Sequence, residues 1–324
     1  MRSAVRVLPL IRPWLWPVAA GLLAATYTFG YMGGHPGTIT DFDQNWVAAR
    51  ALVEGQNPYE IIGPGRALPF PWRTAYPLTT AVACLPFALF ALDIARLLFV
   101  GISVALLVWA IRPGGWRMMV PLLLSLPFMN SLWNVQWSIL LTAAMARPDM
   151  LSGLAGVKPS IGPAILGACT QRRQVLIGLG VALGLLAVSL LLRPGWVPEW
   201  LASVQSVARF PAPVTRVGGP LLLLALLRWR DPRARMLAGL AVMPQTSIWY
   251  EALPLLLIPQ TFKSRACLAI ASQLAFVATV FYPAGWTFDQ EAHATGILMQ
   301  VTLFLPCLIM LFVEPGTGVQ ADRP

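Results

Sequence analysis

The sequence TDFDQNWVAAR, at residues 40–50, runs on to GQNPY at residues 55–59. It places two carboxylates, two carboxamides, a tryptophan and an arginine on one short segment. The segment follows the first long apolar run, at about residues 14–31, of a chain that has only 13 acidic residues. This concentration of polar groups beside a hydrophobic run predicts that the remaining chain is a frame that holds the segment in place.

The amino-acid composition indicates whether the rest of the chain lies in water or in lipid. The chain has 324 residues, of which 57% are hydrophobic and 11% charged, and its mean hydropathy is +0.68. A soluble domain carries about 25% charged residues. Because so much apolar surface cannot be buried in one water-soluble core, we expect most of the chain to lie in lipid. Its apolar runs are continuous rather than alternating, which favours helices over a barrel. The sequence therefore predicts an all-α polytopic membrane protein.

The net charge of +10 would suggest a nucleic-acid partner in a soluble protein. Here the basic residues separate hydrophobic runs, where lipid headgroups and the positive-inside rule account for them. We therefore expect membrane lipids, and no nucleic acid, as partners. The four cysteines lie in apolar segments without metal-ligand spacing, and the acids form no cluster of ligand spacing. No disulfide, metal or cofactor is expected.

Three arginines, at Arg2, Arg6 and Arg12, precede the first apolar run. We interpret the run as an uncleaved span with a cytoplasmic N-terminus, which makes the loop at about residues 34–75 extracytoplasmic. In that loop hydrophobic residues recur at helical spacing and polar residues take the other faces: Phe42, Trp46, Ala49 and Val53 against Gln44, Asn45, Arg50 and Glu54. The pattern predicts an interfacial amphipathic helix that ends near Gly55.

Eleven further apolar runs follow, at about 77–92, 94–111, 118–131, 135–147, 150–170, 175–192, 218–228, 236–246, 249–261, 266–283 and 297–313. Several are shorter than the ~20 residues that cross a bilayer. We therefore expect half-helices, broken at Pro121, Pro127, Pro159, Pro244 or Pro254. The result is a predicted bundle of about 10–12 transmembrane helices, twelve if each run crosses, with both termini inside. That count places Arg112 and Arg117 outside, against the positive-inside rule. No repeat or long linker divides residues 1–324, so one domain is predicted.

Asp41 and Asp43 are the first candidate functional residues. Asp41 could cap the predicted helix, with Gln44 completing a capping-box-like pair, and an acid there suits the helix dipole. Alternatively, its carboxylate could act as the general base for an incoming hydroxyl. The two interpretations are compatible, because a cap fixes the carboxylate in space. Asp43 is the reserve, as a second base, an acceptor contact or support for the cap.

Polar residues within apolar runs are the second set of candidates. Lys158 is the only lysine in such a run, and it either snorkels to the surface or pairs with a phosphate. Asn134 and Gln136 belong to a polar break that suits interhelical hydrogen bonds or substrate contacts.

A later polar interruption, at residues 245–251, includes Trp249 and Glu251. It is either a buried hinge or part of a site, and the cost of an acid beside apolar residues favours the site. In the outer loop, Arg73 could contact a lipid headgroup or a phosphate.

These residues resemble a known pattern. Asp41-Phe42, Trp46, Ala48-Ala49, Gly55 and Pro58-Tyr59 resemble the "DF…W.A…G..PY" signature of the GT-C fold glycosyltransferase family GT87. Weaker similarities follow in the family's order over roughly residues 38–260: Tyr76-Pro77-Leu78, Asn134-Val135-Gln136, Gly153 to Lys158-Pro159, and Ser247 to Glu251.

The resemblance implies a GT-C-like bundle that transfers a hexose, mannose being the first expectation, from a polyprenyl-phosphate sugar to a hydroxyl of a lipid or glycan acceptor. Transfer would occur with inversion at the extracytoplasmic face of a bacterial inner membrane. It implies Asp41 as general base, with no metal. The expected substrate-binding residues are Asp43, Gln44, Trp46, Arg73, Tyr76, Asn134, Gln136, Lys158, Trp249 and Glu251. Two other classes stay open: a transporter or lipid flippase, and a non-catalytic scaffold that binds polyprenyl lipid.

Overall fold

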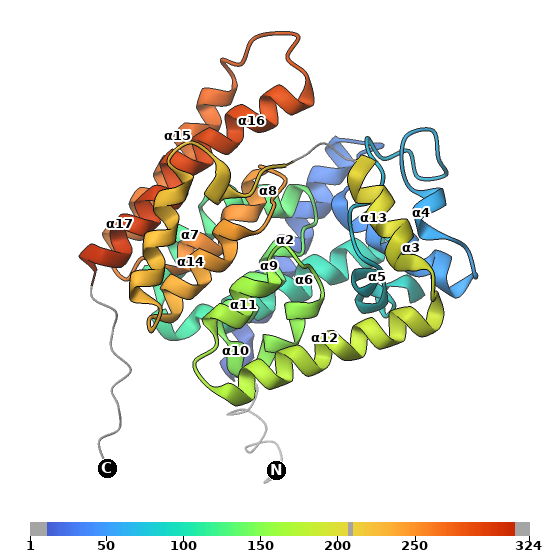
Figure 1. Ribbon diagram of the computed structural model, residues 1–324, viewed down its shortest axis with the longest axis horizontal. Coiled ribbons are helices and arrows are strands. Elements are labelled where there is room, and N and C mark those ends of the chain that lie inside the picture. The colour runs from blue at the N-terminus through green and yellow to red at the C-terminus, as the bar shows by residue number, and fades with distance from the viewer. Residues whose placement is uncertain (1–11, 207–209, 315–324) are drawn as a thin grey trace.

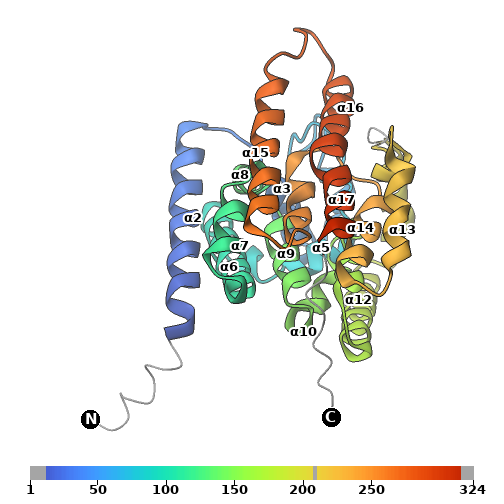
Figure 2. The same ribbon diagram turned by 90° about the vertical axis from the view of Figure 1, so that its left-hand side faces the viewer.

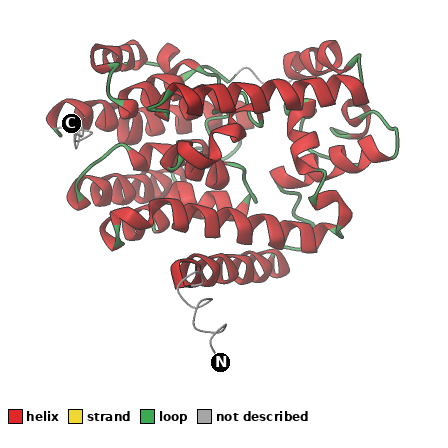
Figure 3. Ribbon diagram, turned by 90° about the horizontal axis from the view of Figure 1, so that it is seen from below, coloured by secondary structure: helices red, strands yellow, loops and turns green. Residues whose placement is uncertain are grey.

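A computed structural model describes residues 12–206 and 210–314, and within those ranges the chain is helical, with no strand. Figure 3 shows helices throughout, joined by short loops. Three helical segments of the described chain are long and apolar enough to cross a membrane: Leu92–Gly114, Arg172–Leu192 and Phe288–Val313. The prediction of an all-α chain with apolar, membrane-length helices is confirmed. The N-terminal Arg2 and Arg6 lie outside the described residues.

The α-helices, labelled as in Figure 1, are α2 (Leu15–Gly34), α3 (Asp41–Val53), α4 (Pro58–Ile61), α5 (Leu78–Cys84), α6 (Leu92–Ile111), α7 (Trp116–Leu123), α8 (Leu126–Trp133), α9 (Ser138–Ala146), α10 (Pro148–Leu151), α11 (Gly162–Ala168), α12 (Arg172–Leu192), α13 (Trp196–Ser206), α14 (Pro232–Val242), α15 (Phe262–Thr279), α16 (Phe288–Met299) and α17 (Leu305–Val313). Segments of 3-10 and π-helix complete the chain. The 3-10 helices are η1 (Arg12–Trp14), η2 (Phe87–Leu89), η3 (Arg112–Gly114), η4 (Ser152–Gly156), η5 (Pro213–Thr215), η6 (Gly219–Arg228) and η7 (Trp249–Leu257), and η8 (Gln300–Phe304) is a π-helix.

Helices α2 and α6 pack along each other and run in opposite directions. The Arg112 guanidinium donates to the carbonyl of Pro13 at 2.8 Å, whereas Arg96 donates to the carbonyl of Thr38 at 3.3 Å. The bundle therefore has an Arg112 end, where α2 begins and α6 finishes, and an Asp41 end, where α2 finishes and α3 begins. Figure 2 shows α2 on the flank of the bundle.

The segment at residues 77–92 does not run from one end to the other. Tyr59 of α4 donates through its hydroxyl to the carbonyl of Tyr76, and Trp46 of α3 donates to the carbonyl of Phe90 at 3.2 Å. Both limits of the segment thus lie against the outer loop. The prediction of a crossing here is wrong, because α5 is seven residues long and turns back at Pro86.

Because residues 77–92 do not cross, the helices that follow them, α6 to α9, run in the direction opposite to that predicted from the sequence. Helix α6 now leads from the Asp41 end to the Arg112 end, so Arg112 and Arg117 lie beside the start of the first helix instead of opposite it. The side chain of Arg147, after α9, stands 4.6 Å from the ring of Trp109 at the same end. Arg112, Arg117 and Arg147 thus lie at one end of the bundle, together with the start of α2.

Residues 148–168 form a hairpin rather than a crossing. Its two limits, Asp149 and Ala168, line one cavity at the Arg112 end. Its tip reaches toward the other end, where Thr80 of α5 donates to the carbonyl of Val157 at 2.5 Å. Gly162 allows the hairpin to close, because a Cβ there would lie 2.4 Å from the carbonyl oxygen of Ala155. Lys158 is at the tip.

The remaining helices complete the frame. Helix α12 lies along the outside of the molecule (Figure 1), with most of its apolar side chains exposed. Helix α13 closes the Asp41 end, where Trp200 and Ser203 donate to the carbonyls of Ala75 and Thr74 at 2.9 and 2.7 Å. At the Arg112 end, Glu314 after α17 accepts from the backbone N–H of Gln260 at 2.6 Å.

Candidate active site

Helix α3 presents Asp41 at its first turn. The N-cap is Thr40, whose backbone N–H and hydroxyl both donate to the carboxylate of Asp43, each at 2.7 Å. The cap interpretation of Asp41 with Gln44 is therefore wrong: Asp43, at the third helical position, has the geometry that reaches back to the N-cap. Capping by Asp43 leaves the Asp41 carboxylate available for other contacts.

The first two turns of α3 are enclosed by protein. Gln44 and Asn45 are each only 1% exposed, whereas Val53, predicted on the buried face, is 72% exposed. The predicted apolar face is buried at Phe42 and Ala49, both 0% exposed, but the polar face is buried as well, so the prediction of an interfacial helix is wrong. The predicted stop is confirmed, since α3 ends at Val53 and Gly55 follows with φ +71°. Periodicity could find the apolar face but could not show that the polar residues face a polar interior.

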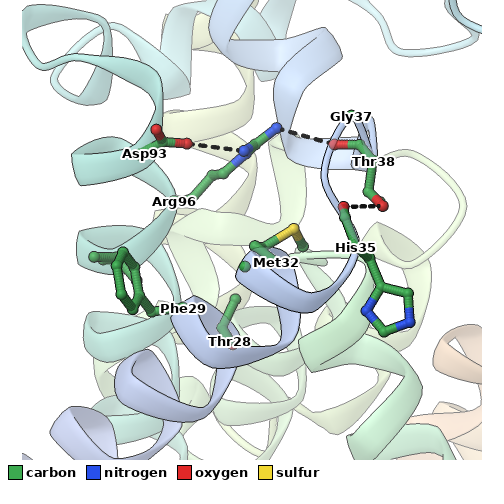
Figure 4. Close-up of a pocket in the computed structure, with 10 residues that line it drawn as sticks. Thr28, Phe29, Met32, His35, Gly37, Thr38, Asp93 and Arg96 are labelled. Atoms are coloured by element: carbon green, nitrogen blue, oxygen red, sulfur yellow. Dashed lines mark hydrogen bonds and ion pairs between the residues drawn. The ribbon is translucent and has the colours of Figure 1, made fainter.

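Arg96 of α6 holds the start of α3. Its guanidinium donates to both carboxylate oxygens of Asp43, at 2.8 and 2.5 Å, and also to Thr38 and Asp93. Figure 4 shows Arg96 between Asp93 and Thr38 at a pocket beside α2. The Asp43 side chain is 1% exposed. Sequence reasoning missed Arg96, because the twelve-crossing count placed it at the opposite face.

Replacing Arg96 with Met is expected to destabilise the protein by about 3–5 kcal/mol, because it leaves the buried Asp43 carboxylate without its cation. Thermal unfolding in detergent measures the change. Arg50→Met is the matched control, since its ion pair with Glu54 is half exposed and contributes about 0–1 kcal/mol. Equal unfolding temperatures for the two variants would contradict the assigned role of Arg96.

Neutral amides hold the Asp41 carboxylate. Gln136 donates to one oxygen at 2.5 Å, and Gln44 donates to the other at 3.1 Å. The carbonyl oxygen of Gln136 accepts from the backbone N–H of Trp137 at 2.9 Å, which turns the NH₂ group toward Asp41. Val135, just before Gln136, has φ +47°, a strained conformation for a β-branched residue. Strain at this position indicates that the direction of Gln136 is imposed by the fold.

A buried ion pair stands beside Asp41. The Lys158 ammonium donates to Glu251 at 2.8 Å, with side chains 9% and 1% exposed. The ammonium also lies 5.6 Å from the ring of Tyr76 and 5.4 Å from that of Tyr250. Lys158 is therefore fixed at the tip of its hairpin by an acid and two aromatic faces, and does not snorkel.

These groups line one cavity of about 540 Å³ at the Asp41 end. The polar side chains in its wall come from five separate parts of the chain and include Asp41, Gln44, Tyr76, Lys158, Ser160, Gln205, Gln245, Thr246, Tyr250 and Glu251. Aromatic rings of Trp72, Trp200 and Phe210 supply much of the remainder. The volume suits a small organic ligand. Two carboxylates and one ammonium face it.

Burial raises the pKa of the Asp41 carboxyl above its ordinary value, while hydrogen bonds from Tyr250 and Gln136 and the charge of Lys158 oppose the shift. A carboxylate with a raised pKa is a stronger base than an exposed one. The arrangement can therefore accept a proton from a hydroxyl placed in the cavity.

The raised pKa gives a pH dependence with a definite sign. Only ionised Asp41 can accept a proton, so turnover is expected to rise as pH increases through the raised folded-state pKa, which lies above the ordinary ~3.9. Because the folded state holds that proton more tightly, ionising Asp41 also lowers stability as pH rises through the same range. Initial rates between acidic and neutral pH measure this. A rate that falls or stays flat over that interval would contradict the assignment of Asp41 as the base.

The other predicted site residues lie elsewhere. Asp43 is engaged by Arg96, and Trp46 faces Phe90 on the far side of α3. Arg73 is exposed beside Gly63. Asn134 donates back to the carbonyl of Asn130 at 2.9 Å and ends α8. Trp249 is buried in the hydrophobic core. None of these five side chains lines the cavity, although Asp43 and Trp249 are the sequence neighbours of Gln44 and Tyr250, which do.

Sequence reasoning did not select Trp72 in the loop before α5, Trp200 on α13 or Phe210 after α13. Their only signal was an aromatic residue in a polar loop. Within the described residues, no three His, Cys, Asp or Glu side chains are close enough to share a metal ion.

The described chain is all-helical and contains apolar helices of membrane-spanning length. A buried acid and a lysine–glutamate pair face one cavity in it. Comparison with protein-family models, with curated proteins and with solved structures finds no significant match to this chain. The resemblance to GT87 therefore stays a prediction, and the function must be argued from the cavity.

Proposed function

We propose that the protein is a membrane glycosyltransferase, in which Asp41 is the general base for the acceptor hydroxyl. One observation carries the proposal: the buried Asp41 carboxylate, held by neutral amide and tyrosine groups and with a raised pKa, faces a cavity of about 540 Å³. Nothing neutralises Asp41 directly, because Lys158 is paired with Glu251. A carboxylate in this state suits proton abstraction better than a structural role.

In the proposed reaction, the acceptor oxygen attacks the anomeric carbon of a polyprenyl-phosphate hexose from the face opposite the phosphate. The bond between that carbon and the phosphate oxygen breaks, the acceptor proton passes to Asp41, and the polyprenyl phosphate leaves with the electron pair. The anomeric configuration inverts. Gln136 and Gln44 orient the base, and Lys158 stabilises its ionised form.

The aromatic and polar walls support a sugar as the transferred group. Hexose rings present both apolar and hydroxyl faces, and Trp72, Trp200 and Tyr76 offer rings while Gln205, Gln245 and Thr246 offer hydrogen-bonding groups. Mannose as the hexose, and a lipid or glycan as the acceptor, come from the sequence resemblance to GT87.

We further infer the membrane orientation from the two ends of the bundle. At the Arg112 end lie Arg112, Arg117, Arg147, Arg172, Arg173, Arg228, Arg230, Arg233, Arg235, Lys263 and Arg265. At the Asp41 end lie Arg50, Arg66, Arg73, Arg96, Arg193 and Arg216. The positive-inside rule then makes the Arg112 end cytoplasmic and opens the cavity toward the extracytoplasmic side of a bacterial inner membrane.

About ten segments would cross in this arrangement: α2, α6, α7 with α8, α9, α12, η6, α14, η7, α15, and α16 with α17. Two apolar runs that the sequence suggested as crossings, at residues 77–92 and 150–170, enter and return at the same end. Both termini of the bundle then face the cytoplasm.

A transporter or flippase is the second candidate, because a re-entrant hairpin with a charged tip is typical of transport proteins. Purified protein in liposomes, supplied with doubly labelled polyprenyl-phosphate-mannose and membrane-extract acceptors, separates the classes. The proposal expects labelled mannose to leave the lipid and enter the acceptor. Movement of intact donor across the bilayer without cleavage would support transport, and binding without either would support a scaffold.

A further inference from the structure

Arg216 is a buried arginine of the Asp41 end that has no acidic partner among the described residues. It lies between η5 and η6 and is 8% exposed. Its guanidinium donates to the carbonyls of Gly296 and Pro211, at 3.2 and 3.1 Å, and to the hydroxyl of Ser247 at 2.7 Å. Its Nε–H is buried without any partner in the described chain.

Other arginines at this end are neutralised or solvated. Arg96 binds Asp43, Arg193 binds Glu199 at 2.6 Å, and Arg50 pairs with Glu54. Burial alone lowers the pKa of Arg216 to about 10, which is the effect of a desolvated cation that lacks a countercharge. A fold that keeps a guanidinium in this state without an internal acid is prepared for an external anion.

Two backbone features make room for the Arg216 guanidinium and its contact with Ser247. A Cβ at Gly296 would lie 3.1 Å from the guanidinium carbon and 3.1 Å from the Ser247 hydroxyl, so only glycine leaves this space open. Ser247 itself has φ +56°, and is one of the two non-glycine residues in the described chain with positive φ. The other, Val135, adjoins Gln136, which donates to Asp41.

The guanidinium does not line the Asp41 cavity itself, but it is bonded to residues next to the cavity wall. Its partners Pro211 and Ser247 are the immediate neighbours of Phe210 and Thr246, both of which line the cavity wall. The cavity needs a cation from outside its own charges, because Lys158 is balanced by Glu251 and Asp41 is negative. A donor phosphate would bring a further negative charge to this space.

We propose that Arg216, with the hydroxyl of Ser247, binds the phosphate of the lipid donor while the sugar occupies the cavity beside Asp41. The inference rests on the proposed function and names its anion subsite. The free Nε–H and an Nη–H released from Ser247 would form the paired edge that guanidinium groups present to phosphate, and Ser247 would then donate its own hydroxyl.

Binding of polyprenyl monophosphate, which carries no sugar, tests the subsite without requiring turnover. Tryptophan fluorescence of the full-length protein in detergent follows it, since Trp72 and Trp200 line the cavity. Arg216→Gln is expected to weaken binding about 10- to 100-fold, the range of a lost charge-assisted hydrogen bond. Arg216→Lys should bind with intermediate affinity, because a lysine keeps the charge but not the paired edge.

Two further variants make the result specific. Gly296→Ala keeps every charge but displaces the guanidinium, so it too should weaken binding. Arg193→Gln, at the same end but already paired with Glu199, should bind as the wild type does. Thermal unfolding is expected to change much less in Arg216→Gln than in Arg96→Met, because Arg216 has hydrogen-bond acceptors but no charged partner to leave unpaired.

Wild-type protein supplies a check that needs no variant. Polyprenyl monophosphate should raise its unfolding temperature, and the polyprenyl alcohol of equal length should not. Unchanged affinity in Arg216→Gln, or equal stabilisation by the alcohol, would overturn the proposal. Displacement of the polyprenyl phosphate by equimolar phosphatidylglycerol would also overturn it, by making Arg216 a general headgroup contact. If wild-type protein binds through Arg216 yet transfers no sugar, the subsite stands and the proposed function fails.

Discussion

Replacement of Asp41 by Asn is expected to reduce sugar transfer by about 10²- to 10⁴-fold, the usual contribution of a positioned general base. The fold should be retained. The carbonyl oxygen of the new asparagine can still accept the hydrogen bond from Gln136, and its NH₂ group can donate to Gln44 after that amide rotates. The Gln44 carbonyl oxygen has no partner among the described residues, so the rotation satisfies a group that is unpaired in the wild type.

Transfer from labelled polyprenyl-phosphate-mannose, at equal protein abundance, measures this effect. The thermal stability of Asp41→Asn at neutral pH should equal or exceed that of the wild type, because the variant no longer ionises a buried carboxyl. Asp43→Asn is the contrasting variant: it should lose stability through Arg96 and the helix cap. Equal transfer by Asp41→Asn and wild type would remove Asp41 as the base.

Replacement of Lys158 by Met is expected to destabilise the protein as strongly as Arg96→Met does. It leaves the Glu251 carboxylate, 1% exposed, without its cation, and breaking a buried ion pair in this way costs about 3–5 kcal/mol. One oxygen of Glu251 has no hydrogen-bond partner in the described chain, and the other has, besides Lys158, a 3.4 Å hydrogen bond from the uncharged hydroxyl of Thr246. We expect a lower unfolding temperature and less folded protein in the membrane.

The double variant Lys158→Met with Glu251→Gln is the control for this prediction. It removes both charges, so most of the lost stability should return, giving a coupling energy well above the error of the measurement. Additive losses in the two single variants would show that the pair contributes nothing through its charges. In that case the hairpin tip would be held by the rings of Tyr76 and Tyr250 alone.

Much of the polar cavity follows from the sequence, because buried polar groups in an apolar chain need one another. Lys158 and Glu251 were each costly in an apolar setting, and the structure brings them beside Asp41 and Gln136 from other parts of the chain. The energetic cost of burying a charge does not show whether that charge pairs with another side chain or contacts a substrate. Lys158 was a candidate for phosphate binding, but its nearest acid is Glu251.

Topology was harder to predict, because hydropathy measures what surrounds a segment and not where the segment leads. Residues 77–92 and 150–170 are apolar enough to be predicted as crossings, yet they return to the end from which they came. Their backbones are enclosed by protein, where irregular turns can be satisfied. Arg112 and Arg117 supplied the signal: their position on the wrong side of the predicted topology marked the missed turn that precedes them.

The cap of α3 was also hard to predict, because it depends on a residue far away in the sequence. Asp41 and Asp43 both suit a helix N-terminus by residue type. Which of them caps the helix depends on Arg96, more than 50 residues away, which draws Asp43 toward Thr40 and leaves Asp41 to the cavity.

The most direct test of the account is the anomeric configuration of the product formed by purified wild-type protein from ¹³C-labelled polyprenyl-phosphate-mannose, read by NMR. A single base that activates the acceptor predicts a transferred sugar whose configuration is inverted relative to the donor. Transfer with retained configuration would contradict the role given to Asp41, and the absence of transfer from any polyprenyl-phosphate hexose would contradict the proposed function itself.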